Sequence, residues 1–457
     1  MVQATYHFPR GFLWGTATAA HQIEGSNTNN QWSKWEEEGH TNGRSGLAAD
    51  WWGGRWREDF DRAAETGQNT HRLSVEWSRI QPTPDKWDED ALEKYRAMLR
   101  GLRDRSITPM VTLHHFTDPL WVTDPATALR QAQGGSSGGA WETEAVVPLF
   151  ERFVRKAVDA LKEYCTLWCT INEPTGYALN GYVAGGVGAF PPGKNNLRLA
   201  MRVQANLIRA HAAAYRAIHE LQPESRVGFA HHYRSIAPHH AWSPLDKFAA
   251  NNFFNGINIG FVSALATGVM RSPIGSVKIP EARGTQDYFG FNYYTREYVT
   301  FDLRKPGTLF GRNFYRKDAE LSDSGFLANE PEGMFEGLKW IVRTFPNLPI
   351  LVTENGVNSV DDKLRTRYIA QHVHQMWRAV NFNWPIKAYY HWSLVDNFEW
   401  DLGWSHRFGL WGLDLDTQKR IRRPSADLYA EICKENGLSS EMVQKYCPEV
   451  FSKIFPE

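Results

Sequence analysis

The stretch Leu167-Trp168-Cys169-Thr170-Ile171-Asn172-Glu173-Pro174 joins a run of strand-forming residues to a glutamate that stands beside an asparagine. β-Branched and aromatic side chains of this kind favour extended backbone. A second run, residues 350–353, ends in the same way at Glu354-Asn355-Gly356. Each glutamate therefore follows directly on the apolar part of a predicted strand.

Short β-rich runs alternate with helical periodicity along nearly the whole chain. The predicted strands cover residues 13–17, 70–75, 108–113, 167–172, 226–230, 288–292, 350–353 and 386–391. Amphipathic helical faces lie between several of them: Leu92, Tyr95, Leu99 and Leu102; Phe150, Phe153, Ala157 and Leu161; Ile369, Val373, Met376 and Val380. Eight strands, each followed by a crossover, predict an α/β fold of the (β/α)8 barrel type.

The predicted strands are farther apart than a minimal βα unit requires, so long loops are expected on the face that carries the site. The Gly/Ser-rich residues 134–139 resemble a linker, but the helical pattern resumes soon after Trp141. We predict a loop at the pocket rim there, and a second irregular rim excursion over residues 305–329. The whole chain, residues 1–457, is predicted to be one barrel domain.

The composition excludes several classes of partner. Lys plus Arg and Asp plus Glu are balanced at 51 each, so no general field favours nucleic acid. The chain has no apolar run of about 18 residues, and residues 1–8 do not have the pattern of a secretory signal. Four cysteines in so long a chain do not indicate a disulfide framework. We expect a cytoplasmic protein without a nucleic-acid or membrane partner.

Polar and aromatic residues follow the predicted strands, and in such barrels functional side chains lie at the C-terminal strand ends. Glycosidic-bond cleavage uses two carboxylic acids, one to donate a proton and one to attack or to activate water. Glu173 and Glu354 are the candidates for this pair. The surrounding amides and imidazoles, with 19 Trp in the chain, suit a ligand covered with hydroxyl groups.

With these residues in these positions, the chain resembles family 1 of the glycoside hydrolases, the β-glucosidase and β-galactosidase family. The matching stretches are Phe8-Pro9-Arg10-Gly11-Phe12-Leu13-Trp14-Gly15-Thr16-Ala17-Thr18, Asn172-Glu173-Pro174, Thr353-Glu354-Asn355-Gly356, the segment from His391 through Trp400, and Phe408-Gly409-Leu410. The resemblance covers essentially the whole chain. It implies a retaining β-glycosidase, a β-glucosidase first of all, that hydrolyses terminal non-reducing β-D-glycosyl residues through a covalent glycosyl-enzyme intermediate. It implies no cofactor and no metal.

The resemblance also implies a role for each matching residue. Glu173 matches the family's general acid/base, and Glu354 matches its nucleophile. Arg72 and Tyr294 match the pair that contacts the nucleophile. The residues matching those that hold the non-reducing-end sugar are Gln22, His115, Asn172, Asn292, Trp392, Glu399 and Trp400. We expect Arg72 to lower the pKa of Glu354, the pKa of Glu173 to be raised, and the two carboxyl groups to lie about 5–5.5 Å apart.

Glu399 bears on the substrate class. A carboxylate there would accept hydrogen bonds from sugar hydroxyls and repel a 6-phosphate, and family members acting on 6-phosphoglycosides resemble each other in replacing this residue. The expected partners are therefore unphosphorylated β-glycosides and oligosaccharides. Phe116 and Thr117 stand where many relatives carry Trp-Asp. This departure leaves the aglycone preference open, and the sequence also leaves open the choice of sugar and a homo-oligomeric state.

Three alternatives stay open at this point. One is a transglycosidase that uses the same intermediate. Another is a catalytically silent sugar-binding barrel. The third is a metal-dependent hydrolase, suggested by the pairs His231-His232 and His239-His240. Adjacent side chains on a strand point to opposite faces, so such a pair makes a poor chelate.

Overall fold

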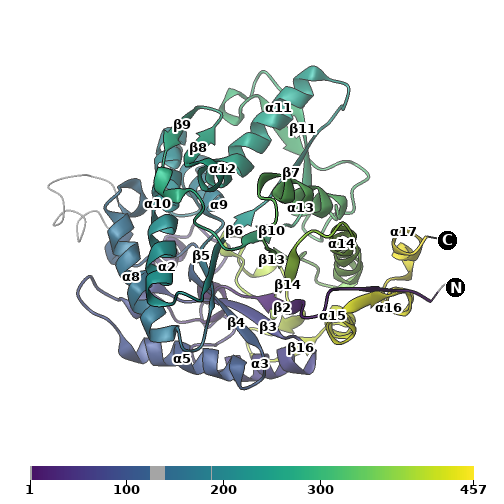
Figure 1. Cartoon of the computed structure of the whole chain (residues 1–457), viewed down its shortest axis with the longest axis horizontal. Helices are drawn as coiled ribbons and strands as arrows, with labels where there is room; N and C mark the ends of the chain where they lie inside the picture. The colour runs from purple at the N-terminus through teal and green to yellow at the C-terminus, as the bar shows by residue number, and fades with distance from the viewer. Residues whose placement is uncertain (1–2, 124–138, 187, 457) are drawn as a thin grey trace.

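The computed structural model describes residues 3–123, 139–186 and 188–456. At its centre eight parallel strands close into a barrel (Figure 1). In chain order they are β2 (Leu13–Ala17), β3 (Thr70–Ser74), β4 (Thr108–His114), β5 (Leu167–Asn172), β6 (Arg226–His232), β10 (Phe289–Asn292), β13 (Ile350–Asn355) and β14 (Ile386–Trp392). Pairing of β14 with β2 closes the ring in register Tyr389↔Trp14. The predicted (β/α)8 barrel is confirmed.

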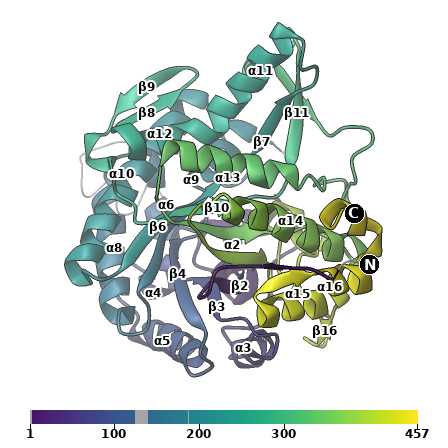
Figure 2. The same ribbon diagram turned by 45° about the vertical axis from the view of Figure 1, so that its right-hand side comes forward.

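Helices surround the barrel (Figure 2). They are α1 (Ala20–Ile23), α2 (Gln31–Glu37), α3 (Trp56–Glu65), α4 (Trp77–Ile80), α5 (Glu89–Arg103), α6 (Leu120–Thr123), α8 (Val146–Leu161), α9 (Pro174–Leu179), α10 (Leu197–Leu221), α11 (Pro244–Phe254), α12 (Gly260–Thr267), α13 (Glu332–Thr344), α14 (Lys363–Asn381), α15 (Pro424–Glu435), α16 (Ser440–Tyr446) and α17 (Phe451–Ile454). The predicted faces of α5 and α8 are buried, as is that of α14 except for the half-buried Val380. Asp88 caps α5 by accepting a hydrogen bond from the Ala91 amide.

Several barrel strands continue past their apolar runs. Strand β6 reaches His232, two residues beyond the predicted end, because His232 still pairs with Asn292 of β10. Strand β13 likewise continues through Glu354 to Asn355. The register between β10 and β13 shifts where Asn292 pairs with Glu354, and such irregularities redirect side chains at strand ends.

Shorter strands lie outside the barrel. They are β1 (Thr5–His7), β7 (Ser235–Pro238), β8 (Val269–Ser272), β9 (Gly275–Lys278), β11 (Arg296–Phe301), β12 (Gly311–Phe314), β15 (Trp411–Leu413), β16 (Arg420–Arg422) and β17 (Gly437–Ser439). Strands β7, β11 and β12 form a small sheet above the barrel in Figure 1. The predicted irregular excursion at 305–329 is therefore partly wrong, because it contains β12 and the 3-10 turn η5 (Pro306–Thr308).

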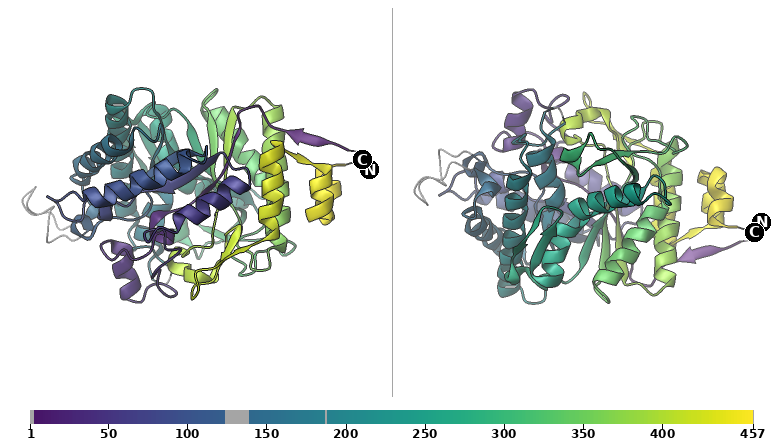
Figure 3. Two further views of the ribbon diagram at one scale, coloured as in Figure 1. Left: turned by 90° about the horizontal axis from the view of Figure 1, so that it is seen from below. Right: turned by 90° about the horizontal axis from the view of Figure 1, so that it is seen from above.

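The ends of the described chain lie together. Strand β1 pairs antiparallel with β17, which brings the two termini to one side of the molecule (Figure 3). Of the predicted Gly/Ser-rich loop, residues 134–138 lie outside the described residues, and Gly139 directly precedes the short 3-10 turn η1 (Ala140–Glu142). Among the described residues, no helix is long and apolar enough to cross a membrane.

Candidate active site

Glu173 and Glu354 occupy two different kinds of strand end. Glu354 lies within β13 and is 3% exposed. Glu173 follows β5 directly, has left-handed backbone angles (φ 43°, ψ 54°), and precedes Pro174 at the first position of α9. A left-handed glutamate costs about 1–3 kcal/mol, and such strain concentrates at functional sites. The backbone turn places this buried carboxyl group in the same cavity as Glu354.

Two strong donors hold Glu354. Arg72 Nη1 donates to Oε1 at 2.6 Å, and the Tyr294 hydroxyl donates to Oε2 at 2.6 Å. Arg72 is itself fully buried and is fixed by Asn172 Oδ1 (2.6 Å) and Thr112 Oγ1 (2.9 Å). Both oxygens of Glu354 are thus occupied by groups that favour its ionised form.

Glu173 has different neighbours. Asn292 Nδ2 donates to Oε1 at 2.8 Å, and His232 Nδ1 lies 3.1 Å from Oε2. Asn292 is oriented in turn by Thr353, whose hydroxyl donates to Asn292 Oδ1 at 2.6 Å. Hydrogen bonds thus link Glu173 through Asn292 of β10 to Thr353 of the adjacent strand β13, the residue before Glu354. The separation of 5–5.5 Å between the two carboxyl groups stays a prediction.

The pKa shifts of the two glutamates run opposite to the expectation. Burial raises the pKa of Glu354 to about 7, although Arg72 opposes this, and the charge of Glu173 raises it further. Burial also acts to raise the pKa of Glu173, but the charge of His232 and hydrogen bonds from His232 and Asn292 outweigh it, so this pKa is lowered. The physical reason is the His232 contact, which the sequence reasoning did not include. The two opposite shifts favour a proton on Glu354 over one on Glu173.

A second cluster of predicted residues forms a polar and aromatic wall. Gln22 Nε2 donates to Glu399 Oε2 at 3.1 Å and to the Phe398 carbonyl at 2.8 Å. The His115 ring stacks against those of Trp392 and Trp400. Burial raises the pKa of Glu399 to about 8, and the charges of Asp401 and Glu354 act in the same direction. Burial therefore favours the neutral acid at Glu399, whereas the expectation from the sequence took this side chain as a carboxylate.

The predicted residues meet at one cavity of about 500 Å³. Those that line it are His115, Asn172, Glu173, Tyr294, Glu354, Trp392, Glu399 and Trp400. Arg72, Gln22 and Asn292 are not among the lining residues, and each donates a hydrogen bond to a carboxyl group that is. Two buried atoms of the cluster, Gln22 Oε1 and His115 Nδ1, have no hydrogen-bond partner among the described residues. Buried polar groups normally have partners, and a hydroxylated ligand would supply them.

Sequence reasoning missed several residues of the cavity wall. They are Phe190, His232, Arg234, Glu297, Tyr315, Phe326, Leu327 and Phe408, together with Phe116, which had been noted only as a departure. The signal for His232 was present in the pair His231-His232. The expected opposite orientation is confirmed, because His231 packs among Phe229, Phe289 and Trp340 while His232 contacts Glu173.

The described residues offer no set of ligands for the metal-dependent alternative. His240 pairs with Asp246 at 2.9 Å and lies outside the cavity. In the part of the chain that the structure describes, no group of three or more His, Cys, Asp or Glu could hold a metal ion.

Comparisons with known proteins agree with this geometry. The sequence model of Glycosyl hydrolase family 1 matches residues 4–438. A β-galactosidase of Pyrococcus woesei is 30% identical, with 96% of this chain and 99% of that protein covered. The structure of a β-glycosidase from Pyrococcus horikoshii matches with a TM-score of 0.86 and 33% identity, covering 97% of this chain and 98% of that one. The β-glucosidase of Thermotoga maritima, solved with glucoimidazole, matches with a TM-score of 0.84 and 28% identity, covering 95% of this chain and 100% of the other.

Proposed function

The chain belongs to glycosyl hydrolase family 1 and is a β-glycosidase, and on that premise we propose that Glu354 is its nucleophile and Glu173 its general acid/base. The observation that carries this assignment is the unequal environment of the two carboxyl groups. Arg72 and Tyr294 both donate to Glu354, whereas neither contacts Glu173 through a hydrogen bond among the described residues. A nucleophile must be ionised to attack, and these donors stabilise that form.

The first step forms a glycosyl ester on Glu354. One carboxylate oxygen attacks the anomeric carbon, the bond to the leaving oxygen breaks, and Glu173 gives its proton to that oxygen. In the second step Glu173, now ionised, takes a proton from water. The water oxygen bonds to the anomeric carbon and the ester bond to Glu354 breaks, so the β configuration is retained.

For the first step to occur, Glu173 must carry a proton and Glu354 must be ionised. A leaving oxygen that accepts a hydrogen bond from Glu173 favours the protonated form of this side chain. Arg72 and Tyr294 favour the ionised form of Glu354. We propose that substrate binding moves the proton from Glu354 to Glu173, and that esterification of Glu354 then removes a negative charge and lets Glu173 ionise as the base.

The substrates we propose are unphosphorylated β-D-glucosides and β-D-galactosides, the two classes that relatives of this chain are named for. The wall of Gln22, His115, Trp392 and Glu399 supports this, because it pairs hydroxyl-binding groups with flat rings. A phosphate would need an unpaired cation, but Arg234 is the only Arg or Lys among the described residues that line the cavity, and it pairs with Glu297.

We propose a cytoplasmic location as well. All four cysteines are buried free thiols, and thiols persist in reducing compartments.

A mechanism-based label tests the central assignment. A 2-deoxy-2-fluoro-β-glucoside with a good leaving group should form a stable ester, because the fluorine slows both steps while the good leaving group speeds only the first. Mass spectrometry of the digested enzyme should find the added sugar on the peptide that contains Glu354. Glu354→Gln should not be labelled, while labelling of a different carboxyl group would refute the assignment.

A further inference from the structure

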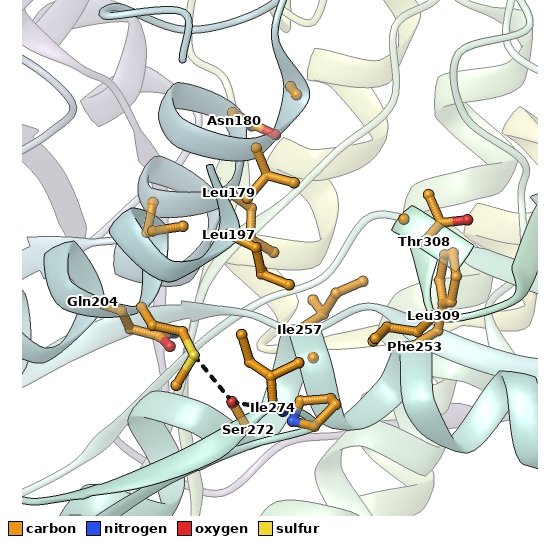
Figure 4. A pocket seen from close by; sticks show the side chains of 18 residues that line it. Leu179, Asn180, Leu197, Gln204, Phe253, Ile257, Ser272, Ile274, Thr308 and Leu309 are labelled. Atoms are coloured by element: carbon orange, nitrogen blue, oxygen red, sulfur yellow. Dashed lines mark hydrogen bonds between the residues drawn. The ribbon is translucent and has the colours of Figure 1, made fainter. Parts of the chain in front are cut away.

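An apolar groove of about 260 Å³ shares the lining residue Asn180 with the active-site cavity. Figure 4 shows the groove. Its walls come from α9, the π-helical turn η2 (Asn180–Ala184), α10, α11, a second π-helical turn η3 (Asn255–Ile259), the hairpin of β8 and β9, and the connection around η5. In Figure 4 the side chains of Leu179, Leu197, Phe253, Ile257, Ile274 and Leu309 surround one common space.

The groove offers few polar partners. Most of its lining side chains are aliphatic or aromatic, and two of the polar ones are already engaged. Gln204 Nε2 donates to Thr175 Oγ1 at 2.7 Å, and the Ser272 hydroxyl donates to Met201 Sδ at 3.4 Å. Because a ligand with many hydroxyls would lose hydrogen bonds to water here, the groove favours an apolar occupant.

Three elements connect the groove to the active-site cavity. Asn180, the first residue of η2, lines both spaces. The hairpin of β11 and β12 contributes Glu297 to the cavity, and its connection contributes Leu309 to the groove. Arg234 lines the cavity, and its backbone exchanges two hydrogen bonds with Asn258 of η3, at 3.1 and 3.0 Å. The groove therefore lies next to the active-site cavity, with Asn180 at the boundary of both.

The direction of the reaction fits this path. The group that leaves takes its proton from Glu173, so the aglycone must lie on the Glu173 side of the cavity. Helix α9 begins directly after Glu173 and ends beside Asn180, a distance of about 9 Å for its six residues. A long aglycone that follows this helix reaches the groove.

We propose that the groove binds the apolar tail of the substrate's aglycone, so that the preferred substrates are amphiphilic β-glycosides with long alkyl or similar aliphatic aglycones. This inference rests on the proposed function, because it takes the sugar to be bound at Glu354 and the leaving oxygen to lie at Glu173. The polar rim of Asn180, Arg234 and Glu297 then lies beside the middle of the ligand, and the groove receives its end.

The test is a chain-length series. We expect kcat/KM for methyl, butyl, octyl and decyl β-D-glucosides, each below its critical micelle concentration, to rise most between butyl and decyl. The rise should be about two- to fourfold for each methylene that enters the groove. A series that stays flat from methyl to decyl would overturn the inference. If none of these glucosides were cleaved, and an aryl β-glucoside were not cleaved either, it would be the proposed function that fails.

Leu309→Asp places a charge in the groove at a residue whose φ of +55° suits aspartate. It should lower the ratio of the decyl to the methyl kcat/KM at least tenfold. Leu303→Asp is the matched control, because Leu303 is 74% exposed on the same connection and does not line the groove. The inference is wrong if Leu309→Asp keeps the wild-type ratio, or if Leu303→Asp loses it equally.

A second variant guards against a folding artefact. Ile274→Asp changes the opposite wall at a residue that is 45% exposed, and it should lower the same ratio with the same melting temperature as the wild type. Size-exclusion chromatography with light scattering tests whether a second copy of the chain occupies the groove instead. A dimer that Leu309→Asp dissociates without any change in the ratio would show that a second copy fills the groove and would overturn the proposal.

Discussion

His232 Nδ1 lies 3.1 Å from Oε2 of Glu173, the proposed acid/base, on the carboxyl oxygen opposite the one that accepts from Asn292. His232 is the last residue of β6, and its ring lies edge-to-face with the Tyr294 ring, with 5.9 Å between the two ring centroids. Tyr294 in turn donates to Glu354. The two carboxyl groups therefore each have a titratable neighbour, and these neighbours touch one another.

Replacing His232 by asparagine should move the alkaline limb of the kcat profile to higher pH. In the wild type the charge of His232 and the hydrogen bonds to Glu173 lower the pKa of that carboxyl group against its burial. Without the charge the pKa rises, so Glu173 keeps its proton, and its capacity as an acid, to higher pH in the enzyme–substrate complex. The measurement is kcat for an aryl β-glucoside at saturating concentration across pH, because kcat reports that complex.

The matched control for this variant is His240→Asn. His240 makes a similar pair with Asp246, at 2.9 Å, but neither residue lines the cavity. Its profile should coincide with that of the wild type. An alkaline limb that stays in place or moves to lower pH in His232→Asn would contradict the role given to this pair.

Tyr294→Phe should lower kcat/KM by about 10- to 100-fold, because a hydrogen bond to a charged group contributes about 1.5–3 kcal/mol. The 2.6 Å hydrogen bond from Tyr294 also lowers the pKa of Glu354, so its loss raises that pKa. The acid limb of the kcat profile, which reports ionisation of Glu354 in the enzyme–substrate complex, should therefore move to higher pH. Tyr315→Phe is the control: Tyr315 lines the same cavity, but its hydroxyl donates to the Phe326 carbonyl. Equal effects of both variants would argue against a specific role for Tyr294.

The barrel could be predicted because its strands are buried on both faces and read as short continuous apolar runs. Each predicted run overlaps one barrel strand, and most ends agree within two residues. The small sheet of β7, β11 and β12 could not be predicted in this way. Strand β11 is partly exposed along its length, and β12 has four residues, so neither leaves a clear periodic signal.

The sequence predicts the proposed site only in part. Strand ends and family resemblance named the residues that surround the cavity, but not how they contact each other. His232 meets Glu173 because β6 pairs with β10 in the register His232↔Asn292, and Asn292 also donates to Glu173. This register depends on the closed barrel, so the sequence alone does not reveal it. The opposite directions of the pKa shifts of Glu173 and Glu354 depend on the same contact between His232 and Glu173.

Arg420→Met should destabilise the fold strongly. Arg420 and Asp59 are both fully buried and lie 2.8 Å apart, and Trp51 Nε1 also donates to Asp59. Without Arg420, the buried Asp59 keeps only the partly exposed Arg62, at 2.7 Å, as a cationic partner. Breaking a buried pair costs about 3–5 kcal/mol. Arg422→Met is the matched control, since Arg422 and Asp427 are each nearly half exposed, and such a pair contributes about 0–1 kcal/mol. Thermal unfolding should show a clear fall in Tm for Arg420→Met alone; similar Tm values for both variants would refute the argument.

Glu173→Ala should separate the two steps of the reaction. With a dinitrophenyl leaving group, which needs no proton, formation of the ester on Glu354 stays fast and its hydrolysis becomes rate-limiting. With a poor leaving group the first step should slow by about 10²–10⁴-fold, the usual contribution of a general acid. Azide needs no base and fits the space left by the carboxyl group, so it should restore turnover and give a β-glycosyl azide. Glu297→Gln, another carboxyl-group change in the same cavity, should show no such rescue. An α-glycosyl azide, or no rescue of Glu173→Ala, would show that Glu173 does not act as the acid/base opposite Glu354.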